Sequence, residues 1–245
     1  MNKERKGFID LHAHILPGVD DGATCMEETL RMLRIANEEQ ITTIIATPHF
    51  AAGAQNTPVE KLREVLEQVQ REAVKINNEM TILLGNEIYY SESVLDALNS
   101  KQVLTLAGSR YVLVEFSPRE TYQTIFRGLG GLVRGGYLPV IAHVERYRCL
   151  YKNEDYLNEL INLGCYLQMN CDSISGGFLD PEAIYYRGLV KQGLIHFLGT
   201  DCHDDKVRTP RMKQAVKQLL KRCDEGLMDK ILYQHPIKIL ENTYI

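Results

Sequence analysis

Seven short runs of apolar and β-branched residues recur along the chain, and each ends in polar residues. They occupy residues 7–14, 42–49, 81–87, 111–116, 138–145, 165–170 and 195–201. Between them lie stretches with apolar residues at three-to-four spacing, such as 26–39 and 58–76, which predicts amphipathic helices. The pattern therefore predicts strands and helices in regular alternation, as in an α/β fold.

Alternating strands and helices form either an open doubly wound sheet or a closed barrel. The sequence has neither GxGxxG after its first strand nor a GxxxxGK[ST] loop, which removes the usual nucleotide-binding versions of the open sheet. It also has no Pro/Ser-rich linker, charge block or internal repeat. We therefore expect one domain over residues 1–245, built as a barrel with its active site at the carboxyl ends of the strands.

Prolines mark three places where a helix is expected to begin. Thr57, Asp180 and Thr209 each stand directly before a proline. A capping residue followed by proline at the first helical position is a common helix start, because that position needs no backbone N–H partner. We expect helices to begin at all three places.

Composition indicates an ordinary soluble protein, with 44% hydrophobic residues, 24% charged residues and a formal net charge of −4. No cluster of Lys and Arg suggests nucleic-acid or membrane binding, and no apolar run has signal-peptide or transmembrane length. The six cysteines form no CxxC pair. We expect a cytoplasmic protein with reduced thiols, no nucleic-acid partner and no membrane insertion, in which bound cations would attract a phosphorylated substrate.

Residues of metal-ligand type end six of the seven predicted strands. They are His12 and His14, His49, Glu87, Glu115, His143, and Asp201 with His203. Strand residues two apart face the same way, so both histidines of the first pair can face the barrel mouth, as can the last pair. Imidazole and carboxylate ligands without a nearby thiolate set suit Zn, Mn or Fe in open catalytic sites. Eight such side chains exceed what one ion needs, which predicts a cluster of two or three.

A single histidine on a strand is more often a packing residue than a ligand, so His49 or His143 alone would indicate little. The combination of motifs at matching strand ends makes coincidence a poor explanation. His196 has the opposite strand parity from Asp201, and His235 lies in the terminal helical region. We expect both of these histidines to be structural.

Other charged residues lie close to the same strand ends. Asp10 shares the parity of the first two histidines but lies deeper, which favours a hydrogen-bonding role over ligation. Asp20 and Asp21 follow a Pro-Gly turn, and their spacing fits a solvated loop as well as a ligand. Arg146 and Arg208 follow ligand-bearing strand ends, where guanidinium groups would suit bidentate phosphate contacts as well as ordinary surface ion pairs.

A thiol phosphatase is the rival enzyme class, because Cys-x5-Arg occurs twice. Cys25 to Arg31 falls in a predicted helix with two glutamates, which cannot form a cradle of backbone amides. Cys202 to Arg208 contains two aspartates that would repel phosphate, and it lacks glycine. We therefore expect metal-assisted rather than cysteine chemistry.

Several longer motifs together resemble a known family. FIDLHAHILPGVDDGA, IATPHF, GNEIYY, LVEF, VIAHVERY and GTDCH are spread over nearly the whole chain. They are similar to the PHP (polymerase and histidinol phosphatase) family, and most of all to the bacterial tyrosine-protein phosphatases of capsular and exopolysaccharide loci. LHAHILPGVDDGA and AHVERY are more specific than HxH or DxH, which recur in other amidohydrolase-like barrels.

The resemblance implies a distorted (βα)7 TIM-like barrel with up to three divalent ions, often manganese, with iron or zinc as alternatives. The ligands it implies are His12, His14, Asp21, His49, Glu87, Glu115, His143, Asp201 and His203. It selects Asp21 over Asp20 and implies that Arg146 and Arg208 assist in holding phosphate. The implied substrate is phosphotyrosine on a tyrosine autokinase that controls polysaccharide export.

The predicted reaction is metal-dependent phosphomonoester hydrolysis by a metal-bound hydroxide, without a covalent enzyme intermediate. Glu87 is the candidate bridging ligand, and Arg146 would offset charge on the phosphoryl oxygens. Alternatives are hydrolysis of histidinol phosphate, of small phosphomonoesters or nucleotides, and of nucleic-acid ends. A non-catalytic, metal-stabilised regulatory module is a further alternative, against which the full ligand set argues.

Overall fold

Parallel strands form the centre of the computed structural model, which describes residues 7–177 and 179–245. The strands are β1 (Phe8–Ala13), β2 (Ile41–Ala46), β3 (His49–Ala51), β4 (Thr81–Leu84), β5 (Glu87–Tyr89), β6 (Tyr111–Glu115), β7 (Leu138–Ile141), β8 (Tyr166–Asn170) and β9 (Phe197–Gly199). One sheet has the order β1-β2-β4 and the other β3-β5-β6-β7-β8-β9. Every pairing within them is parallel, which confirms the predicted α/β class.

Two of the seven predicted strands are interrupted, and each contributes to both sheets. The run 42–49 forms β2 and β3, and the run 81–87 forms β4 and β5. Pro48 has no N–H for a ladder, and a Cβ on Gly85 would lie 3.0 Å from a Leu106 methyl group. The described residues therefore form two sheets where one continuous closed sheet was expected.

The edges of the two sheets meet where β1 passes the end of β9. Ala13 forms an isolated parallel bridge with Cys202. The backbone N–H of Asp201 donates to His12 O at 2.8 Å, and that of His14 donates to Cys202 O at 2.9 Å. These bonds place the first histidine motif directly beside the last aspartate motif.

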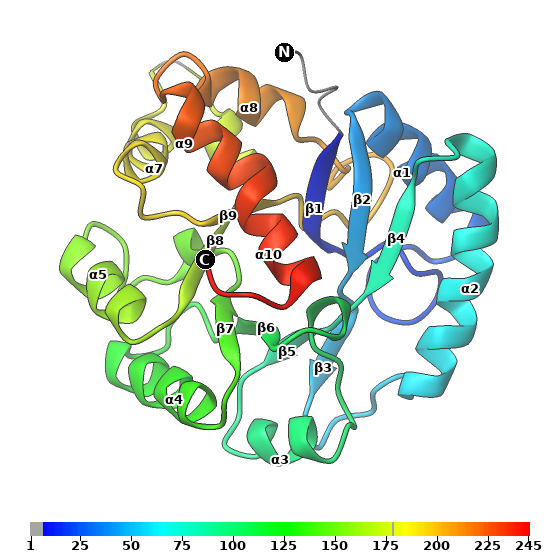
Figure 1. Ribbon diagram of the computed structural model, residues 1–245, viewed down its shortest axis with the longest axis horizontal. Coiled ribbons are helices and arrows are strands. Elements are labelled where there is room, and N and C mark those ends of the chain that lie inside the picture. Colours follow the sequence, from blue (N-terminus) through cyan, green and yellow to red (C-terminus); the bar gives the residue numbers. More distant parts are fainter. Residues whose placement is uncertain (1–6, 178) are drawn as a thin grey trace.

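Helices surround the strands, with α1 and α2 beside the first sheet and α4 and α5 beside the second (Figure 1). They are α1 (Met26–Glu38), α2 (Val59–Ile76), α3 (Val94–Asn99), α4 (Tyr122–Arg134), α5 (Glu154–Asn162), α6 (Cys171–Ser175), α7 (Pro181–Lys191), α8 (Lys213–Leu219), α9 (Glu225–Asp229) and α10 (His235–Glu241). Short helical turns are η1 (Leu106–Gly108), η2 (Val144–Arg146) and η3 (Lys230–Gln234). In the part of the chain that the structure describes, none of the helices is both long and apolar enough to cross a membrane.

Two of the three predicted helix starts are confirmed. Asp180 caps α7 by accepting the backbone N–H groups of residues 182 and 183. α2 begins at Val59, directly after Thr57-Pro58, although the Thr57 hydroxyl donates to Val19 O at 2.9 Å instead of capping the helix. The third prediction is wrong, because α8 begins only at Lys213, beyond the Thr209-Pro210 pair.

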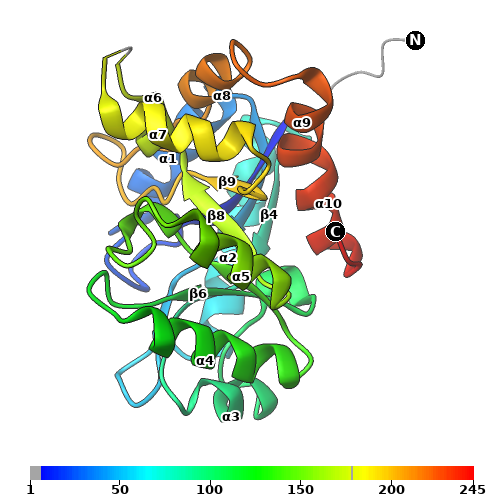
Figure 2. The ribbon, with the colours of Figure 1, turned by 90° about the vertical axis from the view of Figure 1, so that its left-hand side faces the viewer.

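An apolar core closes the end of the molecule at which the strands begin. Fully buried side chains from several strands meet there, including Leu11, Ile45, Leu113, Val140 and Phe197. Ile239 of α10 joins them, and the Tyr111 hydroxyl donates to Thr243 O at 2.7 Å. Figure 2 shows α10 on the side away from the tip of β8. A substrate must therefore approach from the carboxyl ends of the strands.

Candidate metal centre

His12 and His14 bring two imidazoles from the end of β1 into one buried space. Their Nε2 atoms lie 3.3 Å apart. Their other ring nitrogens are held from outside, since His12 Nδ1 lies 3.2 Å from Gln168 Oε1 and His14 Nδ1 lies 2.8 Å from Asp20 Oδ2. An oxygen acceptor beside each Nδ1 orients the ring, so both Nε2 atoms point into the shared space.

Glu87 stands between four imidazoles at the start of β5 and is almost fully buried. Its Oε1 lies 2.8 Å from His143 Nε2 and 3.3 Å from His12 Nε2. Its Oε2 lies 3.1 Å from His49 Nδ1 and 3.3 Å from His14 Nε2. Burial would raise the pKa of Glu87, but the surrounding imidazoles hold that pKa well below its usual value. The carboxylate therefore stays ionised, with each oxygen facing two ligand nitrogens.

Asp201 and His143 both adopt left-handed backbone conformations, with φ of 52° and 31°. Such conformations are costly for residues other than glycine and cluster at functional sites. The expectation that Asp201 and His203 share a strand face is wrong, because β9 ends at Gly199. His203 Nδ1 instead turns back to Asp201 O at 3.0 Å, and its Nε2 lies 3.5 Å from Asp21.

The two carboxylate oxygens of Asp201 face different partners. Oδ1 lies 3.4 Å from His12 Nε2 and 3.5 Å from His14 Nε2. Oδ2 pairs with the guanidinium groups of Arg146 and Arg208, the latter at 2.8 Å. Both arginines are 39% exposed. Since each guanidinium has five N–H donors, both retain donors for an anion at the edge of the ligand cluster.

The candidate ligands gather in three overlapping groups, within each of which the ligand atoms lie within 4.8 Å of one another. The groups are His14, Asp21, His49 and His203; His12, His14, Glu87 and Asp201; and His49, Glu87 and Glu115. His143 lies outside these groups, although its Nε2 contacts Glu87 and lies 3.5 Å from Glu115. Its buried Nδ1 has no hydrogen-bond partner among residues 7–177 and 179–245. His14, His49 and Glu87 each belong to two of the groups. Because the groups share these residues, they are suited to cations that lie next to one another.

The charges around the centre favour cations. Burial would lower the pKa of His14, but the carboxylates of Asp20 and Glu87 raise it to about 10. Burial and the nearby Glu87 raise the pKa of Glu115 to about 7. None of the groups found in the described part of the chain contains a cysteine. Imidazole nitrogens, carboxylate oxygens and fixed ring orientations together fit divalent metal ions such as Mn, Fe or Zn.

Asp20 and Asp21, which spacing alone could not separate, have different surroundings. Asp21 is exposed, and its Oδ1 lies 3.2 Å from His49 Nε2. Asp20 is part-buried, holds His14 and accepts the backbone N–H of His49 at 3.2 Å. Asp21 therefore belongs among the candidate ligands, whereas Asp20 orients them.

Three residues expected to have structural roles lie outside the ligand groups. Asp10 is buried and accepts the backbone N–H of Thr200 at 3.0 Å. His196 Nδ1 accepts the Leu167 N–H at 3.2 Å, and His196 O lies 3.0 Å from His235 Nδ1. Each of these side chains serves the packing and hydrogen bonding of the fold.

The sixth predicted strand, β8, supplies two amides that reasoning from ligand types missed. Gln168 Oε1 accepts the His143 N–H at 2.7 Å, in addition to its contact with His12. Gln168 Nε2 donates to Asn170 Oδ1 at 2.9 Å, and Asn170 Nδ2 donates to Asp201 Oδ2 at 2.9 Å. The signal in the sequence was two amides of the same parity at a strand end, where the other strands carry ligands.

Neither Cys-x5-Arg segment forms a phosphate cradle. Cys202 is fully buried, and burial raises the pKa of its thiol far above the usual value. Cys25 lies directly before α1, and Arg31 within that helix pairs with Asp205. The geometry therefore offers no reactive thiolate facing an anion site.

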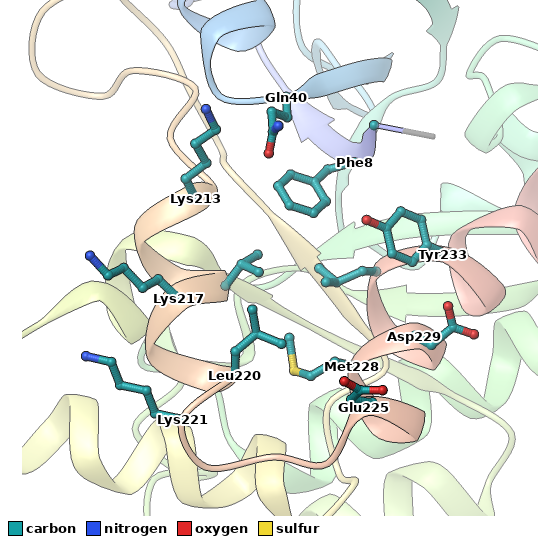
Figure 3. A pocket seen from close by; sticks show the side chains of 13 residues that line it. Phe8, Gln40, Lys213, Lys217, Leu220, Lys221, Glu225, Met228, Asp229 and Tyr233 are labelled. Carbon is teal, nitrogen blue, oxygen red and sulfur yellow. The ribbon is translucent and has the colours of Figure 1, made fainter. Parts of the chain in front are cut away.

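A cavity of about 570 Å³ lies away from the ligand cluster, between the start of β1, α8 and the α9–η3 segment. Phe8, Leu220 and Met228 contribute to its apolar lining. Figure 3 shows the ammonium groups of Lys217 and Lys221 pointing away from it. These two ammonium groups therefore do not converge on the cavity as groups that orient a small ligand would.

Comparison with known proteins gives consistent matches. A family model described as "Capsular polysaccharide synthesis, CpsB/CapC" matches residues 8–241. Tyrosine-protein phosphatase CpsB of Streptococcus pneumoniae is 35% identical over 246 residues, covering 97% of this chain and 100% of that protein. A crystal structure, described under "YwqE from Bacillus subtilis and CpsB from Streptococcus pneumoniae, unique metal-dependent tyrosine phosphatases", matches with a TM-score of 0.88, 32% identity and coverage of 97% and 96%. Histidinol phosphate phosphatase of Lactococcus lactis matches with a TM-score of 0.60, 15% identity and coverage of 88% and 94%, which shows a shared fold alone.

Proposed function

Because the chain belongs to the CpsB/CapC family of capsular polysaccharide synthesis, we propose that it is a metal-dependent protein-tyrosine phosphatase. The resemblance drawn from the sequence motifs is confirmed by these matches. The observation that carries the proposal is the environment of Glu87, whose two oxygens lie between imidazoles in a centre edged by two arginines.

The three overlapping ligand groups support a cluster of up to three divalent ions, and manganese is the expected metal, with iron or zinc as alternatives. In this proposal Glu87 would be the ligand shared between ions, because it belongs to two groups and each of its oxygens faces different nitrogens. His143, with its Nε2 against Glu87, completes the ligand set. Bound ions would supply Lewis acidity that lowers the pKa of a water and offsets charge on the phosphoryl oxygens.

Arg146 and Arg208 hold the phosphoryl group in this proposal. Both already lie at the open edge of the centre and both contact Asp201. Their remaining donors suit the oxygens of a phosphate monoester, since guanidinium groups bind phosphate through paired hydrogen bonds. A tyrosine phenolate, with a pKa near 10, is a better leaving group than a serine alkoxide.

We further propose that the chain is a single domain and that its two sheets together form a distorted (βα)7 barrel. The backbone bonds between β1 and the segment after β9 support that description, since they join the edges of the two sheets. One apolar cluster includes residues from Phe8 to Leu232, which supports a single domain.

The proposed substrate is phosphotyrosine on a tyrosine autokinase of the polysaccharide machinery, as the family's link to capsule synthesis suggests. Kinases use ATP, which bacteria hold in the cytoplasm, so we place the phosphatase there as well. No nucleic-acid partner is proposed, because the net charge of −4 gives no basic footprint.

A substrate panel on one metal-loaded preparation tests the function. It compares a phosphotyrosine peptide with a phosphoserine peptide, histidinol phosphate and a nucleoside monophosphate by kcat/KM. We expect the phosphotyrosine peptide to be preferred by at least about tenfold, or ~1.4 kcal/mol. A preference for histidinol phosphate would replace the proposed substrate class, and metal-replete protein without any turnover would indicate a regulatory module.

A further inference from the structure

Tyr89 is the last residue of β5. It lies two residues after Glu87 of the metal centre, toward the open end of the strands. In the parallel register, Glu87 lies beside His49 of β3. Two residues later, Tyr89 lies beside Ala51 on one neighbour and Glu115 on the other. Because alternate strand residues share a face, Tyr89 faces the same way as Glu87, displaced by about 6.6 Å.

Tyr90, the next residue along the chain, does not share the placement of Tyr89 at the open end of the strands. The ring of Tyr90 stacks on Phe116 with centroids 4.7 Å apart. Tyr89 is 44% exposed, and within residues 7–177 and 179–245 its side chain has no hydrogen bond, ion pair or ring contact. Its neighbour Ala51 is small, which leaves the ring uncovered on the β3 side.

The shape of the interior decides which way a substrate's side chain must run. Leu11, Leu113 and Phe197 are fully buried and fill the interior toward the strand starts. A phosphoryl group at the centre can therefore carry its ester group only toward the mouth. In that direction the ester group passes Tyr89, which lies beside the candidate ligand Glu115.

We infer that Tyr89 packs against the phenol ring of the substrate's phosphotyrosine and thereby makes the site prefer aryl over alkyl phosphate esters. This inference rests on the proposed function and names the residue that selects its substrate class. Aromatic rings pair favourably in offset-stacked or edge-to-face arrangements. A phosphoserine side chain has no ring to place at this position, so it gains nothing from Tyr89.

The test compares Tyr89→Ala and Tyr89→Phe with wild type. Tyr244→Ala is the matched control, because this tyrosine is 62% exposed and lies beyond α10, at the closed end. Three quantities are measured at verified equal metal content. They are kcat/KM for a phosphotyrosine peptide, the Kd of the same peptide carrying a non-hydrolysable phosphonate, and the inhibition constant of orthophosphate, which lacks a ring.

We expect Tyr89→Ala to lower kcat/KM and weaken phosphonate binding by about 2- to 13-fold, the range of an aromatic pair. Orthophosphate inhibition should not change, Tyr89→Phe should behave like wild type, and so should Tyr244→Ala. An equal loss for orthophosphate, or no loss for either ligand, would overturn the inference. A wild-type protein that cannot hydrolyse the phosphotyrosine peptide would instead overturn the proposed function.

Discussion

Replacing Gln168 with leucine tests whether the amides of β8 hold the metal centre in shape. Gln168 is fully buried and serves two candidate ligands at once. Its Oε1 accepts the His143 N–H at 2.7 Å and lies 3.2 Å from His12 Nδ1. Its Nε2 donates to Asn170, which in turn holds Asp201. Leucine preserves much of the volume but removes every one of these polar contacts.

The expected magnitude follows from the groups left without a partner. Each buried donor that loses its acceptor costs about 1–3 kcal/mol, so the His12 and His143 donors together cost roughly 2–6 kcal/mol of folding free energy. His12 also loses the contact that orients its ring. Loss of such an outer partner lowers metal affinity or activity by about 10- to 100-fold.

Three measurements on Gln168→Leu separate these effects: urea unfolding in chelator, metal titration by calorimetry, and kcat/KM at saturating metal. Gln70→Leu is the control, because the Gln70 amide donates to Ile82 O at 2.8 Å, away from the centre. Gln168→Glu keeps the acceptor but loses the donor to Asn170, and should bind metal better than the leucine variant. Wild-type metal affinity and activity in Gln168→Leu would refute the positioning role.

The remaining predictions concern the metal, the arginines, the thiol and one glycine. Exhaustive chelation should abolish phosphatase activity and Mn should restore it; full activity in verified metal-free protein would contradict the mechanism. Arg146→Ala should cost about 2–4 kcal/mol in kcat/KM, roughly 30- to 1,000-fold, at unchanged metal content, with only partial rescue by lysine. Cys202→Ala should keep most activity whereas His203→Ala loses nearly all, and the reverse order would restore the thiol mechanism. Gly22→Ala should weaken metal binding in calorimetry, because its Cβ would lie 2.2 Å from His14 O; unaltered binding would show that the loop adjusts.

The strand pattern was largely predictable because it depends on residues that are close together in the sequence. Runs of apolar and β-branched residues marked all seven strands, and five of them form without interruption. The breaks after β2 and β4 were not predicted, although Pro48 and Gly85 were visible in the sequence. Whether such residues end a strand or bend it into a second sheet depends on the neighbouring strands.

The candidate ligands were also predictable from the local sequence, because they directly follow the apolar runs that predict the strands. His14, His49 and Glu87 come together in the structure from three different predicted strands, although His49 and Glu87 begin β3 and β5 instead of ending a strand. The geometry of Asp201 and His203 was predicted incorrectly, because the left-handed φ of Asp201 ends the strand alternation there.

The sequence by itself determined the order of strands and helices, the strand ends that carry imidazole and carboxylate groups, and the unsuitability of both Cys-x5-Arg segments for binding phosphate. Only the tertiary structure decided which atoms face the centre. His12 acquires its orientation from Gln168, which is 156 residues away along the chain. Arg146 reaches Asp201 across 55 residues. Strand periodicity acts between neighbours along the chain, whereas the orientation of an imidazole depends on hydrogen-bond partners that only folding brings within about 3 Å.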